Sequence, residues 1–280
     1  MSSDVYAAVK RFYEDPLVVA RYASNDELTR GEKVILERYG DQIARADLLD
    51  IGVGAGRTTP YLMEASAAYT GIDYSEAMLE RCRAKWPRAR LLWCDARDLS
   101  VFESGAFDVV WAVLSGLDDV GHEDRLRMLQ EIHRVTRPRG LFIFSAHNRD
   151  ARLRSAYCPP PPALGIQPVA MLYENARRLR YWIAGMRNNL RNRKGERREP
   201  DYAVLNDESN NFGLLSYYIR KQDQIAQLRA TGFRPLQVLD RRGAPLCAGE
   251  LSRDPWLCYV ARRVSRAVQS SREAVAQEAL

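Results

Sequence analysis

The sequence predicts an α/β protein built on an open, doubly wound and mostly parallel β-sheet. Short apolar segments, such as 69–73 and 107–114, alternate with segments of helical periodicity, such as 75–83 and 125–135. The apolar segments lack the polar alternation of a half-exposed strand, which indicates strands that are covered on both faces. In an open sheet of this kind, ligands bind beyond the carboxyl ends of the strands.

Composition and charge narrow the class of protein. The 280 residues are 46% hydrophobic and 28% charged, which is typical of a globular protein. No apolar run approaches the roughly eighteen residues that span a bilayer, and the N-terminal residues lack the pattern of a secretion signal. The five cysteines form no C-x-x-C pair, so we expect neither a metal site nor a disulfide framework. We therefore expect a cytoplasmic protein with no membrane partner.

The net charge of +6 is concentrated in one segment. Residues 149–200 contain twelve Lys and Arg residues against four acids. Such a run is most often a solvated surface, but it is also suited to binding a carboxylate, a phosphate or an acidic peptide.

A glycine-rich loop follows the apolar segment that begins at Leu48. Its glycines stand at alternate positions: Gly52, Gly54 and Gly56. Glycine allows the backbone to turn sharply and to pass close to a ligand. The dinucleotide pattern G-x-G-x-x-G would require a third glycine where Arg57 stands, which disfavours a nicotinamide cofactor. Asp50 precedes the first glycine, and its carboxylate suits a cationic ligand better than a pyrophosphate.

Two further acids follow the next two predicted strands. Asp73 lies at the end of the second strand, where a carboxylate is suited to accept both hydroxyls of a ribose. Asp95 lies at the end of the third strand. Taken alone, an acid at this position has an alternative explanation as the N-cap of the next helical turn. Acids at three neighbouring strand ends, together with the glycine loop, predict a ligand site at this edge of the sheet.

These residues resemble the cofactor site of class I S-adenosylmethionine-dependent methyltransferases of the small-molecule or peptide type. The resemblance implies a Rossmann-like sheet of seven strands. A short connection between the last two strands, 235–240 and 256–261, predicts an antiparallel edge strand. The resemblance also implies S-adenosyl-L-methionine as the cofactor and S-adenosyl-L-homocysteine as the product. The implied cofactor contacts are Asp50, Gly52, Gly54, Gly56, Asp73, Tyr74, Met78, Asp95, Ala96, Leu114 and Ser115.

The resemblance also divides the chain. The expected parts are a helical N-terminal cap (1–45), a cofactor-binding core (46–149 and 213–263), a basic lid over the acceptor site (150–212) and a tail (264–280). Within the lid we expect a proline-rich connector, a helix ending at Asn192, and an irregular stretch over 201–211. Arg139 stands where the family commonly has glycine, which bears on the geometry of that turn.

The acceptor side is predicted from the cap and from two strand ends. In relatives, cap tyrosines face the acceptor, and here these are Tyr13 and Tyr22, although plain packing explains them equally well. His147 has a ring whose ordinary pKa is near neutrality, so it is a candidate general base; a hydrogen bond to neighbouring backbone is the alternative. The candidate catalytic residues are His147, Tyr13 and Tyr22, and the candidate acceptor-binding residues are Tyr13, Tyr22, Gly116, His147 and Asn148.

We therefore expect methyl transfer to an oxygen or nitrogen of a small molecule or peptide, and the basic segment favours an acidic acceptor such as a carboxylate. Two alternatives remain open. One is an RNA methyltransferase that uses the basic segment, although no aromatic-interleaved basic motif supports nucleic-acid binding. The other is a non-catalytic protein that binds S-adenosylmethionine. The sequence is compatible with a monomer or a homodimer.

Overall fold

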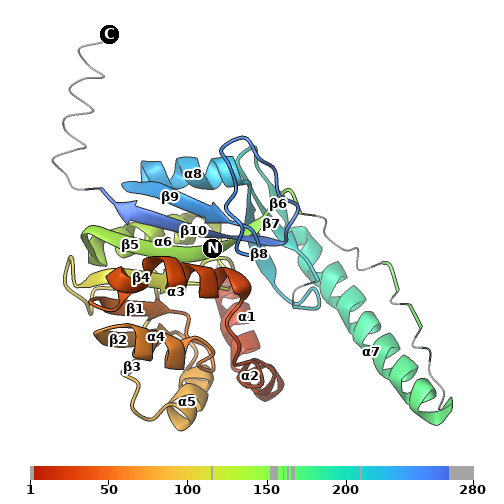
Figure 1. Cartoon of the computed structure of the whole chain (residues 1–280). Coiled ribbons are helices and arrows are strands. Elements are labelled where there is room, and N and C mark those ends of the chain that lie inside the picture. The colour runs from red at the N-terminus through yellow and green to blue at the C-terminus, as the bar shows by residue number, and fades with distance from the viewer. Residues whose placement is uncertain are drawn as a thin grey trace.

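A computed structural model describes residues 3–114, 116–151, 157–159, 161–162, 164, 168–208 and 210–264. In this part of the chain a twisted β-sheet is covered by helices on both faces (Figure 1). The predicted α/β class is therefore confirmed. The helices are α1 (Ser3–Tyr13), α2 (Pro16–Ala23), α3 (Arg30–Ile43), α4 (Thr59–Ala65), α5 (Glu76–Lys85), α6 (His122–Val135), α7 (Pro168–Asn192) and α8 (Lys221–Ala230). The strands are β1 (Asp47–Ile51), β2 (Ala68–Asp73), β3 (Leu91–Trp93), β4 (Phe107–Ala112), β5 (Thr136–Asn148), β6 (Arg197–Arg198), β7 (Tyr202–Asn206), β8 (Leu215–Ile219), β9 (Phe233–Leu239) and β10 (Trp256–Arg263).

The sheet reverses its winding at β1. Strands run in the order β3-β2-β1-β4-β5 with parallel pairing throughout, so the chain winds outward in both directions from β1 and β4. A ligand crevice is expected at this reversal, beyond the carboxyl ends of the strands.

The antiparallel strand lies inside the sheet and not at its edge. β10 pairs antiparallel with β5 on one side and with β9 on the other, so β9 is the edge strand. The described residues also form ten strands and not seven, because β6, β7 and β8 extend the sheet beyond the tip of β5. The short connection correctly predicted the direction of pairing, but the order of strands depends on tertiary contacts.

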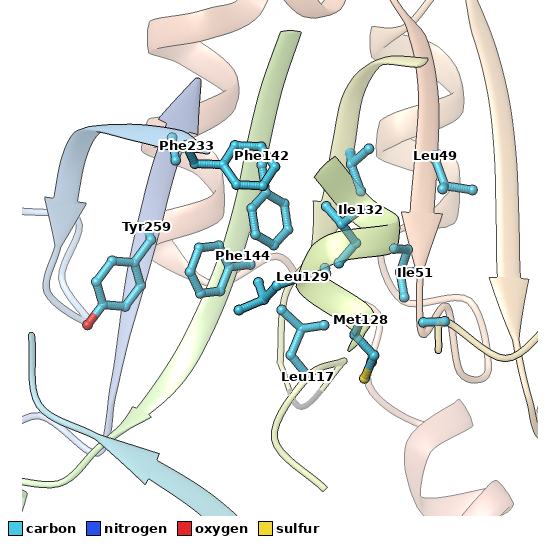
Figure 2. Packing of buried hydrophobic residues seen from close by; sticks show 14 of the residues in the cluster. Leu49, Ile51, Leu117, Met128, Leu129, Ile132, Phe142, Phe144, Phe233 and Tyr259 are labelled. Atoms are coloured by element: carbon cyan, nitrogen blue, oxygen red, sulfur yellow. The ribbon is translucent and has the colours of Figure 1, made fainter. Parts of the chain in front are cut away.

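Both faces of the parallel strands are buried, as their unbroken apolar runs predict. On one face, residues of β4 and β5 pack with α6 and α8; Figure 2 shows Leu129 and Ile132 of α6 against Phe142 and Phe144 of β5. On the other face, residues of α3 and α4 pack on the strands, including Ile35, which is fully buried.

The cap helices begin at residues that the sequence marks. Asp15 accepts a hydrogen bond from the Leu17 amide, and Pro16 occupies the first helical position of α2, where no N–H is needed. Thr29 and Glu32 form a reciprocal capping box at the start of α3. These caps fix where the helices begin, and therefore where the side chains of α1 and α2 can reach.

The segment predicted to be a lid forms one long helix and strands that join the sheet. Residues 202–206 form β7 and not an irregular stretch, because they pair antiparallel with β8. Helix α7 projects away from the sheet (Figure 1), and its sole buried residue in the described part is Gly185. Although α7 is the longest described helix, neither it nor any other helix in the described ranges is long and apolar enough to cross a membrane.

Candidate active site

A cavity of about 350 Å³ lies at the carboxyl ends of β1, β2 and β4, beneath α1 and α2. This is the size range of small-molecule sites in proteins. Predicted site residues that line it are Tyr13, Tyr22, Gly52, Gly54, Asp73, Tyr74, Met78, Asp95, Ala96, Leu114 and Gly116. Ser115 lies outside the described residues. The predicted residues Asp50, Gly56, His147 and Asn148 do not line the cavity.

The glycine loop has the backbone geometry that the sequence predicts. Gly52, Gly54 and Gly56 have φ values of 73°, 54° and 89°, in the region that favours glycine. A β-carbon on Gly52 would lie 3.3 Å from the Cα of Gly116, so the loop passes close to the turn after β4. Gly56 serves packing instead, since its carbonyl accepts a hydrogen bond from the indole of Trp86 at 2.9 Å.

Asp73 is held at the end of β2 by backbone donors. Its Oδ2 accepts from the Gly54 amide at 2.8 Å, and its Oδ1 accepts from the Ser75 amide at 2.9 Å. Burial raises the pKa of Asp73 to about 6, although these hydrogen bonds oppose the shift. Each carboxylate oxygen retains a free lone pair. The glycine loop and the Asp73 carboxylate therefore present one polar surface to the cavity.

Asp95 is less free than the sequence suggests. Arg97 pairs with it through three donated hydrogen bonds of 2.6 to 3.0 Å. Burial alone would raise the pKa of Asp95, but the bonds from Arg97 outweigh it and lower the pKa. Arg97, which we did not single out from the sequence, also lines the cavity and lies over the ring of Tyr6 at 4.1 Å.

The Asp50 carboxylate stabilises the residues around the glycine loop through two hydrogen bonds. Its Oδ2 accepts from the hydroxyls of Thr58 at 2.8 Å and Tyr69 at 3.0 Å. Burial raises the pKa of Asp50 to about 7, against the effect of these two bonds. The predicted contact between this carboxylate and a cationic ligand therefore does not fit its position, because the side chain is buried against Thr58 and Tyr69 and does not line the cavity.

Arg57, the residue that breaks the dinucleotide pattern, ties the loop to the cap. Its guanidinium donates two hydrogen bonds of 2.7 Å to Glu32 of α3, whose side chain is fully buried. A planar guanidinium matches a carboxylate in this paired geometry. From the sequence, Arg57 was noted only because it departs from the dinucleotide glycine pattern. Nothing in the sequence indicated that Glu32 is its partner.

The cap supplies a cluster of tyrosines at the other end of the cavity. The ring of Tyr13 lies 5.7 Å from that of Tyr22 and 6.2 Å from that of Tyr74. The hydroxyl of Tyr13 donates a hydrogen bond to Oδ2 of Asp119, which lines the same cavity. Asp119 was not predicted from the sequence; it lies in the loop that follows β4, seven residues after the end of the strand.

His147 is not placed to act as the predicted general base. Its Nδ1 lies 3.0 Å from Oδ2 of Asp118, a contact that is ionic and lacks the alignment of a hydrogen bond. Burial would lower the pKa of His147, but Asp118 outweighs this and raises the pKa to about 9. The ring is therefore protonated at neutral pH and cannot accept a proton. Arg125, fully buried, pairs with the same Asp118 at 2.6 Å.

Asn148 also has a structural role in place of the predicted acceptor contact. Its amide donates to the carbonyls of Ser252 at 2.7 Å and Asp254 at 3.0 Å, which anchors the segment leading into β10. No described residue of 150–212 lines the cavity, so the predicted lid does not cover it there. One hydrogen bond between the cap and the described part of this segment is donated by Arg21 to Asn210 at 3.2 Å.

Comparison with known proteins identifies the core of the chain. Residues 49–144, which carry the glycine loop and the strand-end acids, match a family model described as a methyltransferase domain. The chain contains a class I S-adenosylmethionine-dependent methyltransferase domain. The resemblance inferred from the sequence is thereby confirmed.

Curated relatives of this methyltransferase domain share only part of their length with the chain. A probable S-adenosylmethionine-dependent methyltransferase of Mycolicibacterium smegmatis is 29% identical over 121 residues, 43% of this chain and 45% of that protein. A malonyl-[acyl-carrier protein] O-methyltransferase of Pseudescherichia vulneris is 28% identical over 127 residues, 44% of this chain and 48% of that protein. The chain thus spans a little under half the length of these relatives.

The similarity of fold extends over most of the chain. A solved 1,6-didemethyltoxoflavin-N1-methyltransferase of Burkholderia thailandensis, crystallised with S-adenosylhomocysteine, covers 95% of this chain and 91% of its own, with a TM-score of 0.56 and 16% identity. At this identity the likeness concerns the fold alone, and it agrees with the Rossmann-like class predicted from the sequence.

Proposed function

We propose that the protein transfers a methyl group from S-adenosylmethionine to an oxygen or nitrogen of a small molecule. The observation that carries this proposal is the polar surface at the end of β2, where the buried Asp73 carboxylate and the Gly54 amide meet inside the cavity. A carboxylate at this position is suited to accept both hydroxyls of a ribose.

The residues present fit that cofactor. A β-carbon on Gly52 would lie 3.3 Å from the Cα of Gly116. Glycine at this position therefore leaves space for a ligand that any side chain would occupy. The hydroxyl of Tyr74 is buried in the cavity lining without a hydrogen-bond partner among the described residues, which suits a site that a ligand completes. The glycine loop would hold the amino-acid part of the cofactor, Asp73 its ribose, and Met78 and Ala96 its adenine.

Catalysis would depend mainly on alignment. When bound, S-adenosylmethionine supplies a methyl group that is already activated by a positively charged sulfur. The protein needs to hold an acceptor in line with that methyl group and to exclude water. Helices α1 and α2, whose tyrosines line the cavity, are the elements placed to do so.

The acceptor is proposed at the level of a small molecule with a nucleophilic oxygen or nitrogen. The names of the relatives include both an O-methyltransferase and an N1-methyltransferase, so they do not select between the two atoms. The basic segment 149–200 does not support an acidic acceptor, because none of its described residues lines the cavity.

Calorimetry with S-adenosylhomocysteine tests the cofactor site. Replacing Asp73 by alanine removes an acceptor of two hydroxyl hydrogen bonds, each worth about 1.5 kcal/mol or more at a charged group, so affinity should fall by about 100-fold. Glu103→Ala, at an exposed carboxylate outside the cavity, is the control and should bind as the wild type does. Unchanged affinity in Asp73→Ala would remove Asp73 from the site.

Incubation with S-adenosyl-[methyl-¹⁴C]methionine and fractionated cell extract tests the reaction itself. Label in a small-molecule fraction is the expected result. Label in RNA, with binding that weakens steeply as salt rises, would favour the nucleic-acid alternative. Tight binding of the cofactor with no labelled product in any fraction would make the protein a non-catalytic binder.

A further inference from the structure

The acceptor end of the cavity contains one carboxylate, Asp119, that no described cation contacts in an ion pair, although the charge of His147 acts on it. Asp119 is 6% exposed, and its partners among the described residues are two hydroxyls. Tyr13 donates to its Oδ2, and Ser216 donates to its Oδ1 at 3.1 Å. Each carboxylate oxygen has two lone-pair positions, so each can accept one further hydrogen bond from a ligand.

The other acids that line the cavity are already engaged. Asp95 is paired with Arg97, and Asp73 is held by the amides of the glycine loop and of Ser75. Asp119 differs from both because it lies under the cap, in contact with Tyr13 of α1. It is therefore the carboxylate placed for an acceptor molecule and not for the cofactor.

Of the groups at this end of the site, the Asp119 carboxylate is the one placed to accept a proton from an acceptor. Those facing it are Tyr13 (α1), Tyr22 (α2), Tyr74 (after β2), Asp118 (same loop), His147 (β5) and Ser216 (β8). Burial, followed by the charge of Asp119, raises the pKa of all three tyrosines, so the phenols stay protonated. Burial raises the pKa of Asp119 itself only to about 6, so the carboxylate is ionised at neutral pH.

We propose that Asp119 binds an N–H or O–H group of the acceptor and takes its proton during methyl transfer, which makes the acceptor an amine or hydroxyl compound and not a carboxylic acid. This rests on the proposed function. The acceptor nitrogen or oxygen bonds to the methyl carbon, the carbon–sulfur bond breaks with its electron pair remaining on sulfur, and the acceptor proton passes to the Asp119 carboxylate, which later releases it to water.

The same geometry disfavours an anionic acceptor. A substrate carboxylate beside Asp119 would meet a like charge in a buried site, where such repulsion is strong. The cationic side chains that line the cavity do little to offset it, since Arg57 and Arg97 are each paired with an acid. Arg21, which also lines the cavity, is exposed and donates to Asn210. Tyrosine rings, in contrast, favour a cationic or aromatic acceptor.

The chemical class of the product tests the proposal. The low-molecular-mass fraction of a cell extract is divided by ion exchange into cationic, neutral and anionic pools, and each is incubated with wild-type protein and S-adenosyl-[methyl-¹⁴C]methionine. The expected label lies in the cationic or neutral pool and survives mild alkali, as N-methyl and ether groups do. Label that alkali releases as methanol marks a methyl ester, which would overturn this inference and leave the proposed function standing.

Asp119→Asn tests the role of the carboxylate. The amide keeps the shape of the side chain but is not a base, so product formation should fall by at least 100-fold at pH 7.5. Affinity for S-adenosylhomocysteine, measured by calorimetry, should stay within threefold of the wild type, and Glu103→Gln should match the wild type in both measurements. A near-wild-type rate in Asp119→Asn overturns the role. An absence of label with wild-type protein, despite cofactor binding, refutes the proposed function itself.

Discussion

Replacing His147 by glutamine removes the ring that pairs with Asp118 and thereby tests why this histidine is not a general base. In the folded protein the pKa of His147 is raised to about 9, because the attraction of Asp118 outweighs the effect of burial. In the unfolded chain a histidine titrates near 6.5. The ion pair therefore stabilises the folded state fully below pH 6.5, and this contribution is lost as the pH rises to 9 and above.

The size of the effect follows from the two pKa values. A difference of about 2.5 pH units corresponds to about 3 kcal/mol of stability. The His147 side chain is 11% exposed, so solvent screening reduces this figure little. Urea unfolding of wild type and His147→Gln, each at pH 6 and pH 10, gives two differences in the free energy of unfolding. We expect the wild-type advantage to be about 3 kcal/mol larger at pH 6 than at pH 10.

The titration can also be observed directly. The chain has three histidines, so the ring resonance of His147 is the one missing from the spectrum of His147→Gln. Its NMR midpoint should lie near 9. A midpoint near 6.5, or a stability difference that does not change with pH, would refute the ion pair with Asp118 and return His147 to the list of candidate bases.

Three further predictions concern the stability of the folded protein. Asp50→Asn should be more stable than wild type by up to about 4 kcal/mol at pH 8 and equal to it at pH 3, because the raised pKa of about 7 makes ionisation in the folded state costly; a constant difference in urea unfolding at both pH values would contradict this. Gly56→Ala should lose about 2 kcal/mol, since φ is 89° and the new Cβ would lie 2.7 Å from Trp86. Its control is Gly40→Ala in α3, where nothing lies within 4 Å and calorimetric melting should show a small gain. Arg139→Gly should gain about 1 kcal/mol because Arg139 has a φ of 69°, and an unchanged melting temperature would refute strain at this turn.

The sequence by itself determined the cofactor half of the molecule. The apolar runs, the glycine loop and the strand-end acids are local signals, because each follows from the backbone conformation of a few consecutive residues. Parallel strands place their carboxyl ends on one edge, so acids that are far apart in the chain were expected to meet there. Eleven of the predicted site residues do line one cavity: Tyr13, Tyr22, Gly52, Gly54, Asp73, Tyr74, Met78, Asp95, Ala96, Leu114 and Gly116. The resemblance to the methyltransferase family also singled out Arg139, which stands where that family commonly has glycine.

Only the tertiary structure decided how the charged side chains are partnered. Asp50 and His147 lie near the carboxyl ends of β1 and β5, and Asp119 lies in the loop after β4. The sequence does not show which partner each of these side chains has. Their roles differ because Asp50 meets Thr58 and Tyr69, His147 meets Asp118, and Asp119 meets Tyr13 of the cap. The last two contacts join residues that are 29 and 106 positions apart in the chain. The protonation state of a buried group depends on such neighbours and on its burial, and both are properties of the packed molecule.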